Sequence, residues 1–243
     1  MNPVAILQHE DHLSPGSLQT CLQQFGIPMQ VFRPDQGQAV PKEAKDFSGI
    51  VLLGSERCAL DPVAWIRTEL ALCRDALSLE VPVLGLGIGA QLLTMAAGGK
   101  VIPCPVPSYG WALTRFTAQA NALFGAQAPL ELFNAHAHRL ELPAGAQNLL
   151  YDGRNPSKGY ALGPHLALLC PLELTQQGLQ AWCARKSSQL SLAKGPDVQS
   201  RISMLRALPE RMGKLEQLAA KLFSRWALQL PGAPRPVDAK LAA

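Results

Sequence analysis

The sequence predicts a single α/β domain whose mostly parallel sheet is covered by helices on both faces. Apolar runs of four or five residues alternate with stretches in which apolar residues recur at helical spacing. Strands that alternate with helices in this way favour a doubly wound sheet. A length of 243 residues and an apolar fraction of 48% are ample for one hydrophobic core of this kind.

The first half of the chain supplies this alternation. Strands are expected at residues 4–7, 29–33, 49–53 and 82–86. The first helix is expected to have Ser14 as its N-cap and Pro15 as its first helical residue, and to end at Gly26. The second helix is expected to be capped by Asp61 and Pro62.

After Lys100 the pattern turns to strands and loops, and beyond Thr175 it becomes helical. Further strands are expected at residues 101–102, 111–116, 130–133, 146–151 and 160–170. The stretch 134–138 is expected to be a solvated loop, because two histidines without a third ligand, His136 and His138, are weak evidence for a metal site. No metal is expected. An apolar stripe from Leu215 to Trp226 should pack on the domain.

A sharp turn from a buried strand into a helix is predicted at Gly87. The turn reads Gly85-Leu86-Gly87-Ile88-Gly89, and it places residue 87 at the tip, beside the free N–H groups of a helix N-terminus. In doubly wound sheets ligands bind outside the carboxyl ends of the strands. Gly54, after the third strand, and Gly87, after the fourth, are therefore expected to face the same crevice.

The residues around this turn resemble a known family. Residues 82–93 read P-V-L-G-L-G-I-G-A-Q-L-L and resemble the class I glutamine amidotransferase pattern P-V-L-G-I-C-L-G-A-Q-L-L, as in the amidotransferase domain of GMP synthases. The resemblance implies a flavodoxin-like domain over residues 1–185. Beyond it, the apolar stripe predicts a helical extension at 186–230 packed on the same domain, and the Pro- and Gly-rich composition predicts a flexible tail at 231–243. The resemblance also implies that Gly87 stands where the family has its nucleophilic cysteine.

The family's general base is missing as well. Its last catalytic strand ends in Gln-Phe-His-Pro-Glu, whereas this chain reads Cys170-Pro171-Leu172-Glu173. If Glu173 matches the family's glutamate, Pro171 takes the histidine position. If Cys170 and Pro171 match the His-Pro pair, Leu172 takes the glutamate position. Neither register supplies a histidine, so no catalytic triad is intact, and the positions Gly87, Pro171 and Glu173 are expected to be vestigial.

A ligand cleft is nevertheless expected to persist. The residues that the resemblance assigns to this cleft are Gly54, Ser55, Gly89, Gln91 and His136. The family's turn after the third strand reads Gly-Gly-Pro and holds an oxyanion with its backbone N–H groups, whereas here Ser55 and Glu56 follow Gly54. An inward carboxylate of Glu56 would repel a developing negative charge, and one pointing to solvent would not. Both orientations remain open.

The sequence therefore favours a catalytically degenerate amidotransferase-like protein. It should need no cofactor and act by binding a small amide, an amino acid or a partner protein. One alternative is an active amidotransferase or hydrolase with an unconventional thiol, Cys58 or Cys170, assisted by His9, His136 or His165. A second alternative is dinucleotide binding through the Gly-Leu-Gly-Ile-Gly-Ala stretch, which is disfavoured because the motif follows the fourth strand rather than the first.

Composition narrows the setting and the partners. A cytoplasmic location is expected, because there is no membrane-spanning run, no signal-peptide pattern and no Cys-x-x-Cys pair among six cysteines. Residues 185–225 carry a net charge of +6, against +4 for the whole chain, and are expected to form a solvated basic face rather than a docking surface for an acidic partner. Neither nucleic-acid nor membrane binding is expected, and the pattern favours no particular oligomeric state.

Overall fold

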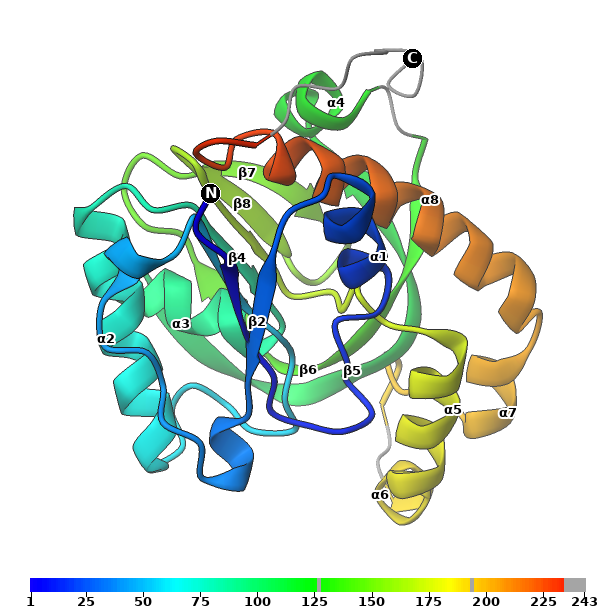
Figure 1. Cartoon of the computed structure of the whole chain (residues 1–243). Helices are drawn as coiled ribbons and strands as arrows, with labels where there is room; N and C mark the ends of the chain where they lie inside the picture. The colour runs from blue at the N-terminus through cyan, green and yellow to red at the C-terminus, as the bar shows by residue number, and fades with distance from the viewer. Residues whose placement is uncertain (126–127, 193–194, 234–243) are drawn as a thin grey trace.

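The computed structural model describes residues 1–125, 128–192 and 195–233, and its centre is a nine-stranded sheet (Figure 1). The strand order is β2-β1-β3-β4-β9-β8-β7-β5-β6. The strands are β1 (Val4–Leu7), β2 (Met29–Phe32), β3 (Gly49–Leu52), β4 (Val83–Leu86), β5 (Lys100–Phe116), β6 (Leu130–Glu141), β7 (Gln147–Tyr151), β8 (Gly159–Leu162) and β9 (His165–Leu168). The first five strands in this order run parallel and the remaining pairs are antiparallel. The flavodoxin-like order of the parallel part confirms the predicted fold class.

Helices cover both faces of the sheet. Figure 1 shows α2 (Ala64–Ser78) and α3 (Ile88–Ala96) on one side and α1 (Gly16–Gln24) with α8 (Leu208–Ala227) on the other. The sheet has a hydrophobic core on each face, and alternate residues of β1 point into one or the other. Val4 and Ile6 pack with α1 and α8, whereas Ala5 and Leu7 pack with α2 and α3. This division is the physical basis of the doubly wound arrangement.

Both predicted helix caps are wrong. The first helix begins at Gly16, and its N-cap, Pro15, has helical dihedral angles and makes no side-chain capping bond. The second helix has Val63 as its N-cap, and Asp61 instead accepts a hydrogen bond from the N–H of Cys58 at 3.2 Å. The predicted end of the first helix is confirmed, because Gly26 adopts φ +63° directly after the C-cap Phe25.

The strands after Lys100 are longer than predicted. The expected segments 101–102 and 111–116 belong to one strand, β5, which pairs with β6 along most of its length, with an irregularity between Pro103 and Ser108. The stretch 134–138 lies inside β6, so the prediction of a solvated loop there is wrong. The expected strand 160–170 is instead the hairpin of β8 and β9.

The C-terminal part of the described chain is helical. It contains α5 (Gln176–Arg185), α6 (Ser187–Leu192), α7 (Arg201–Leu205) and α8, and the short helix α4 (Ala118–Phe124) precedes β6. The predicted apolar stripe of α8 is buried from Leu215 to Trp226. Of the tail expected at 231–243, residues 234–243 lie outside the described residues. Among the described residues, no helix combines the length and apolar character needed to cross a bilayer.

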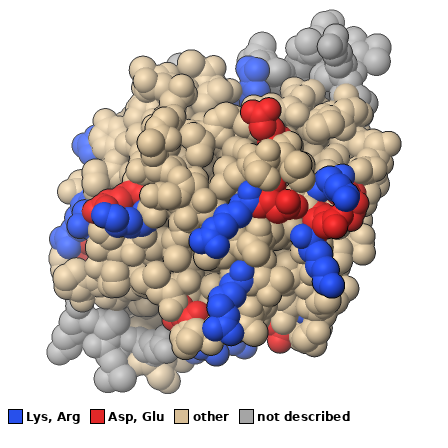
Figure 2. Space-filling model, turned by 90° about the vertical axis from the view of Figure 1, so that its left-hand side faces the viewer, with Lys and Arg blue, Asp and Glu red and all other residues tan. Residues whose placement is uncertain are grey.

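Charges on the surface are interspersed. Figure 2 shows the side of the molecule that lies on the left of Figure 1, where basic and acidic side chains lie next to one another. That face offers no single-signed patch for a polyanion. The expectation of a purely solvated basic face at 185–225 is wrong for Lys186 and Arg211, whose side chains are 15% and 20% exposed and pair with Glu56 and Glu131, respectively.

Candidate ligand cleft

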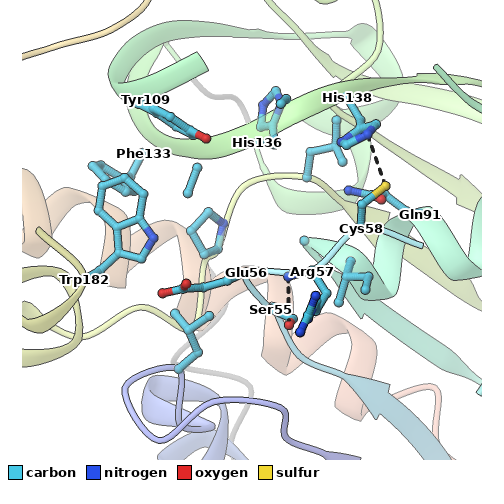
Figure 3. Close-up of a pocket in the computed structure, with 18 of the residues that line it drawn as sticks. Ser55, Glu56, Arg57, Cys58, Gln91, Tyr109, Phe133, His136, His138 and Trp182 are labelled. Atoms are coloured by element: carbon cyan, nitrogen blue, oxygen red, sulfur yellow. Dashed lines mark hydrogen bonds between the residues drawn. The ribbon is translucent and has the colours of Figure 1, made fainter. Parts of the chain in front are cut away.

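A cavity of about 120 Å³ lies at the carboxyl edge of the parallel strands (Figure 3). Its walls come from the loop after β3, the start of α3, the middle of β6, the segment after β9 and the region of α5. Gly54 and Gly87 both line it, and a Cβ added at Gly87 would lie 3.1 Å from Cα of Gly54. The expected shared crevice is therefore present.

Gly87 occupies the tip of the turn between β4 and α3. Its backbone has φ +58° and ψ −113°, a conformation that strains residues with a side chain, and its N–H donates to the carbonyl of Leu168 at 2.9 Å. The tip thus faces the cavity with a hydrogen atom in place of a side chain.

The flanking glycines allow close packing within the protein. A Cβ at Gly89 would lie 2.3 Å from the carbonyl oxygen of Leu52, and one at Gly85 would lie 2.5 Å from the carbonyl oxygen of Gly89. These glycines let α3 approach the strands closely. The Gly-x-Gly-x-Gly spacing is thus explained by contacts with the protein's own backbone rather than with a dinucleotide.

The segment after β9 brings Pro171 to the cavity and leaves its neighbours buried. Pro171 lines the cavity, Leu172 is fully buried, and the carboxyl Oε1 of Glu173 lies 3.4 Å from the N–H nitrogen of Gly54. The Glu173 side chain is fully buried, and its Oε2 has no hydrogen-bond partner among the described residues. Burial raises the pKa of Glu173 to about 7.

Cys170 is not part of the cavity wall. Its side chain is fully buried, with Sγ 3.7 Å from Oδ1 of Asn134, and burial raises the pKa of its thiol. Among the two cysteines considered as substitute nucleophiles, only Cys58 lines the cavity.

Most backbone N–H groups of the loop after β3 are already bound. Five of the six N–H groups of residues 54–59 donate to side-chain oxygens: Gly54 to Glu173, Glu56 to Glu10, Arg57 to Ser55, Cys58 to Asp61 and Ala59 to Gln91. A developing oxyanion would have to compete with side chains for these five donors.

Glu56 lies at the mouth of the cavity and its charge is balanced. Its carboxylate oxygens lie 3.1 Å from Nζ of Lys186 and 3.4 Å from Nε of Arg185. Burial opposes ionisation, but the hydrogen bond and charge of Lys186, helped by Arg185, hold the pKa of Glu56 below its usual value. The carboxylate is therefore paired with basic residues at the mouth of the cavity.

Two histidines of β6 face the cavity together, because side chains two residues apart on a strand share a face. His136 is 7% exposed, and neither of its ring nitrogens has a hydrogen-bond partner among the described residues. Burial, helped by the charge of Lys158, lowers the pKa of His136 to about 4, so its ring is neutral at pH 7. His138 lies beside Cys58, with Nε2 3.1 Å from Sγ (Figure 3).

Sequence reasoning missed this partnership. It named His9, His136 and His165 as candidate partners for a thiol, whereas His9 pairs with Glu69 at 2.7 Å and the imidazole beside Cys58 belongs to His138. The signal was the i, i+2 spacing of the two histidines, which places them on one face once residues 134–138 are assigned to a strand.

The remaining walls combine an amide with aromatic rings. The side-chain Oε1 of Gln91 accepts from the N–H of Ala59 at 3.0 Å, so this glutamine ties α3 to the loop after β3. On the opposite side Trp182 packs edge-on against Tyr109 and Phe133, with ring centroids 5.8 and 5.4 Å apart. Figure 3 shows the Tyr109 hydroxyl turned toward the cavity.

Comparison with known proteins identifies the family. The family model described as "Glutamine amidotransferase class-I" matches residues 15–153, more than half of the chain. The chain belongs to the class-I glutamine amidotransferase family. A solved glutamine amido transferase from Methylobacillus flagellatus is 33% identical to this family member, with a TM-score of 0.90 over 95% of this chain and 96% of that one. A glutamine amidotransferase from Thermotoga maritima, at 18% identity and a TM-score of 0.81, covers 93% and 97% and shares the fold.

Curated relatives match a smaller part of this chain. A GMP synthase from Porphyromonas gingivalis is 35% identical over 108 residues, which cover 44% of this chain and 20% of the relative. Gamma-glutamyl peptidase 5 of Arabidopsis thaliana is 29% identical over 133 residues, which cover 51% and 53%. The chain thus spans about a fifth of the length of that GMP synthase and about half of that peptidase.

The chain presents several polar side chains at its cavity. Among the described residues, no group of three or more His, Cys, Asp or Glu side chains is arranged to hold a metal ion. Its cavity offers a neutral buried imidazole, a thiol–imidazole pair and a balanced carboxylate at the mouth.

Proposed function

We propose that this chain is a catalytically degenerate class-I amidotransferase that binds a ligand in its cleft without hydrolysing glutamine at the family's position. The observation that carries this proposal is Gly87 at the tip of the strand-to-helix turn, the place of a nucleophile elbow, with Pro171 in the same cavity wall. A hydrogen atom cannot attack a carboxamide carbon, and proline cannot accept its proton. Losing the nucleophile or base of such a unit lowers turnover by about 10⁴- to 10⁶-fold.

The register in which Pro171 and Glu173 take the histidine and glutamate positions belongs to this proposal. Pro171 borders the cavity with Gly87, and Glu173 lies behind it against Gly54. In the other register the histidine position would fall on Cys170, which is buried and does not line the cavity. The bound N–H groups of the loop after β3 also support the loss of activity, because an oxyanion would have to displace the side chains that already accept hydrogen bonds from them.

The ligand we propose is a small amide or amino acid. The cavity presents a buried, unpaired imidazole at His136 and the polar side chains of Ser55 and Gln91 beside an apolar wall. In the other form of this proposal, the cleft binds a partner protein instead of a small molecule. This form is prompted by the GMP synthase relative, of which the match covers only 20%. We place the chain in the cytoplasm, because the six cysteines are all free and a reducing compartment keeps thiols in that state.

The test is to add glutamine to the purified chain and measure ammonia release and binding separately. We expect ammonia at the level of the blank, and a calorimetric or thermal-shift signal for an amide or amino acid that a His136→Gln variant weakens. Steady ammonia release well above the blank from the unmodified chain would overturn the proposal.

In the alternative function, hydrolysis by unconventional groups, Cys58 would be the nucleophile and His138 the base. This alternative lacks an oxyanion donor in the loop of the thiol itself, because the N–H groups of Ala59 and Leu60 already donate to Gln91 and to the Cys58 sulfur. The same ammonia measurement decides between the two functions.

A further inference from the structure

The cavity contains a thiol and an imidazole in direct contact, away from the turn at Gly87. Cys58 comes from the loop after β3 and His138 from the middle of β6, and Sγ lies 3.1 Å from Nε2. Figure 3 shows the pair at one end of the cavity, next to Gln91. Both side chains line the cavity, so a molecule inside it has access to the sulfur.

A second, independent feature of the same wall indicates that a polar ligand enters here. His136, two residues before His138, is 7% exposed and has no hydrogen-bond partner for either ring nitrogen among the described residues. A buried polar group without a partner is costly, and a ligand that bonds to it removes that cost. A neutral imidazole donates from one nitrogen and accepts at the other, which matches a carboxamide.

We propose that Cys58 and His138 form a nucleophile–base pair that takes up an α,β-unsaturated carboxamide or a similar carbonyl compound covalently. As the sulfur forms a bond to the β-carbon, the thiol proton moves to Nε2 of His138. The electron pair of the C=C bond shifts to the α-carbon, which then takes the proton back from the imidazolium. One S–C bond and one C–H bond form, the S–H bond and the C=C π bond break, and no oxidant or leaving group is needed.

Addition fits this site better than acyl transfer. A tetrahedral intermediate at Cys58 would need donors for its oxyanion, and the N–H groups of Ala59 and Leu60 are already engaged. In conjugate addition the sulfur attacks the β-carbon and the carbonyl carbon does not become tetrahedral. The carbonyl oxygen then needs one hydrogen-bond donor, and His136 in the same cavity wall can supply it. The result is capture without turnover, and it does not depend on the state of the turn at Gly87.

Burial favours the neutral forms of both members of the pair. Burial, with the carboxylate of Asp61, raises the pKa of the Cys58 thiol, while the N–H of Leu60 acts in the opposite sense. Burial lowers the pKa of His138, and Asp61 opposes that effect. At neutral pH the imidazole is therefore unprotonated and able to act as a base toward the thiol.

The chain supplies its own matched control. Cys104 on β5 is also partly exposed, and no hydrogen bond from its thiol to an imidazole is present among the described residues. Burial raises the pKa of the Cys104 thiol, as it does that of Cys58, and the charge of Arg139 opposes this effect at Cys104, which makes this thiol a demanding comparison. The experiment is to treat the folded chain with acrylamide and to follow the modification of each cysteine by peptide mass spectrometry at several pH values.

We expect Cys58 to react faster than Cys104 at pH 7, and His138→Gln to slow Cys58 by about 100-fold, the lower end of what a positioned base contributes, without slowing Cys104. Because a base assists it, Cys58 should react at a nearly constant rate between about pH 7 and pH 8, whereas an unassisted thiol well below its pKa gains about tenfold per pH unit. Circular dichroism checks that the variant is folded, and the pH profile of the unmodified chain needs no variant.

The inference would be overturned by equal reactivity of Cys58 and Cys104, or by a Cys58 rate that rises with pH as steeply as that of Cys104. An unchanged Cys58 rate in folded His138→Gln would do the same. None of these measurements involves glutamine hydrolysis, so their failure would leave the proposal of a degenerate amidotransferase standing.

Discussion

The carboxyl group of Glu173 reaches the backbone N–H of Gly54, with Oε1 3.4 Å from the nitrogen, and its other oxygen has no partner among the described residues. Burial raises the pKa of this group to about 7 from an ordinary value of 4.5. The native state therefore holds a proton on Glu173 over a pH range in which the unfolded chain has lost it. Its contribution to stability is fully present below pH 4.5 and is lost as the pH rises toward 7.

The first prediction concerns Glu173→Gln, which keeps an oxygen for the Gly54 N–H and removes the titration. Relative to the original chain, the variant should gain roughly 3 kcal/mol in free energy of unfolding between pH 4.5 and pH 8, the equivalent of the pKa shift. Urea unfolding at pH 5, 6, 7 and 8 measures the difference. A constant difference across this range would contradict the raised pKa.

A separate prediction concerns the histidines, whose effect has the opposite sign. The folded-state pKa of His136 is lowered by burial to about 4, so stability from this group is present above pH 6.5 and is lost as the pH falls toward 4. His136→Gln should flatten the loss of unfolding free energy between pH 6.5 and pH 4, measured by the same urea titrations. A loss as steep as that of the original chain would show that this ring does not govern the acid limb.

Restoring the family's side chains tests the degenerate turn. Gly87→Cys alone and Pro171→His alone should release no ammonia from glutamine above the blank, and the double variant should release it measurably. The φ of +58° at residue 87 and the 3.1 Å approach of a new Cβ to Gly54 imply a stability cost of about 1–3 kcal/mol for the cysteine. Activity in either single variant would mean that another residue supplies the missing group.

The buried ion pair of Lys158 and Asp152 gives a prediction about stability. The Lys158 Nζ lies 3.2 Å from Oδ2 of Asp152 and 2.6 Å from Oγ1 of Thr114, and its side chain is fully buried. Asp152→Asn leaves that charge without its counterion and should cost about 3–5 kcal/mol. Adding Lys158→Met to the first change should recover part of this loss. A double variant no more stable than Asp152→Asn alone would rule out an unpaired charge as the cause.

The packing of α8 is tested with a matched pair of substitutions. Trp226 is 2% exposed and lies over Gly49 at the start of β3, whereas Ile202 on α7 is 78% exposed. Trp226→Ala should lower the free energy of unfolding by about 3–5 kcal/mol, and Ile202→Ala should change it by less than about 0.5 kcal/mol. Equal effects in chemical denaturation would mean that α8 contributes little to the core.

Local patterns were sufficient to predict the parallel half of the fold. Four-residue apolar runs, glycine-marked strand ends and the stripe of α8 depend on nearest neighbours in sequence, and the structure has each of them. The meeting of Gly54 and Gly87 was predictable because parallel strands end at one edge. The helix caps were not, since the start of a short helix depends on contacts as much as on its capping residue.

The antiparallel half and the thiol pair depend on long-range contacts. Residues 134–138 contain alternating small and polar side chains, and they lie in a strand because β5 pairs with β6 on both sides of the irregularity between Pro103 and Ser108. Cys58 and His138 are 80 positions apart, so no spacing within either segment indicates that they meet. Only the fold brings the loop after β3 against β6.

One hydrogen bond ties the turn at Gly87 to the neighbouring strand β9. The N–H of Gly87 binds the carbonyl of Leu168 on β9, the strand whose other edge carries the β8 hairpin. The position of the turn is therefore coupled to a hairpin whose own residues lie outside the cavity wall. Substitutions that shift β8 should therefore change the affinity of the cleft for its ligand. Variants with altered affinity can be sought in this hairpin as well as among the side chains that line the cleft.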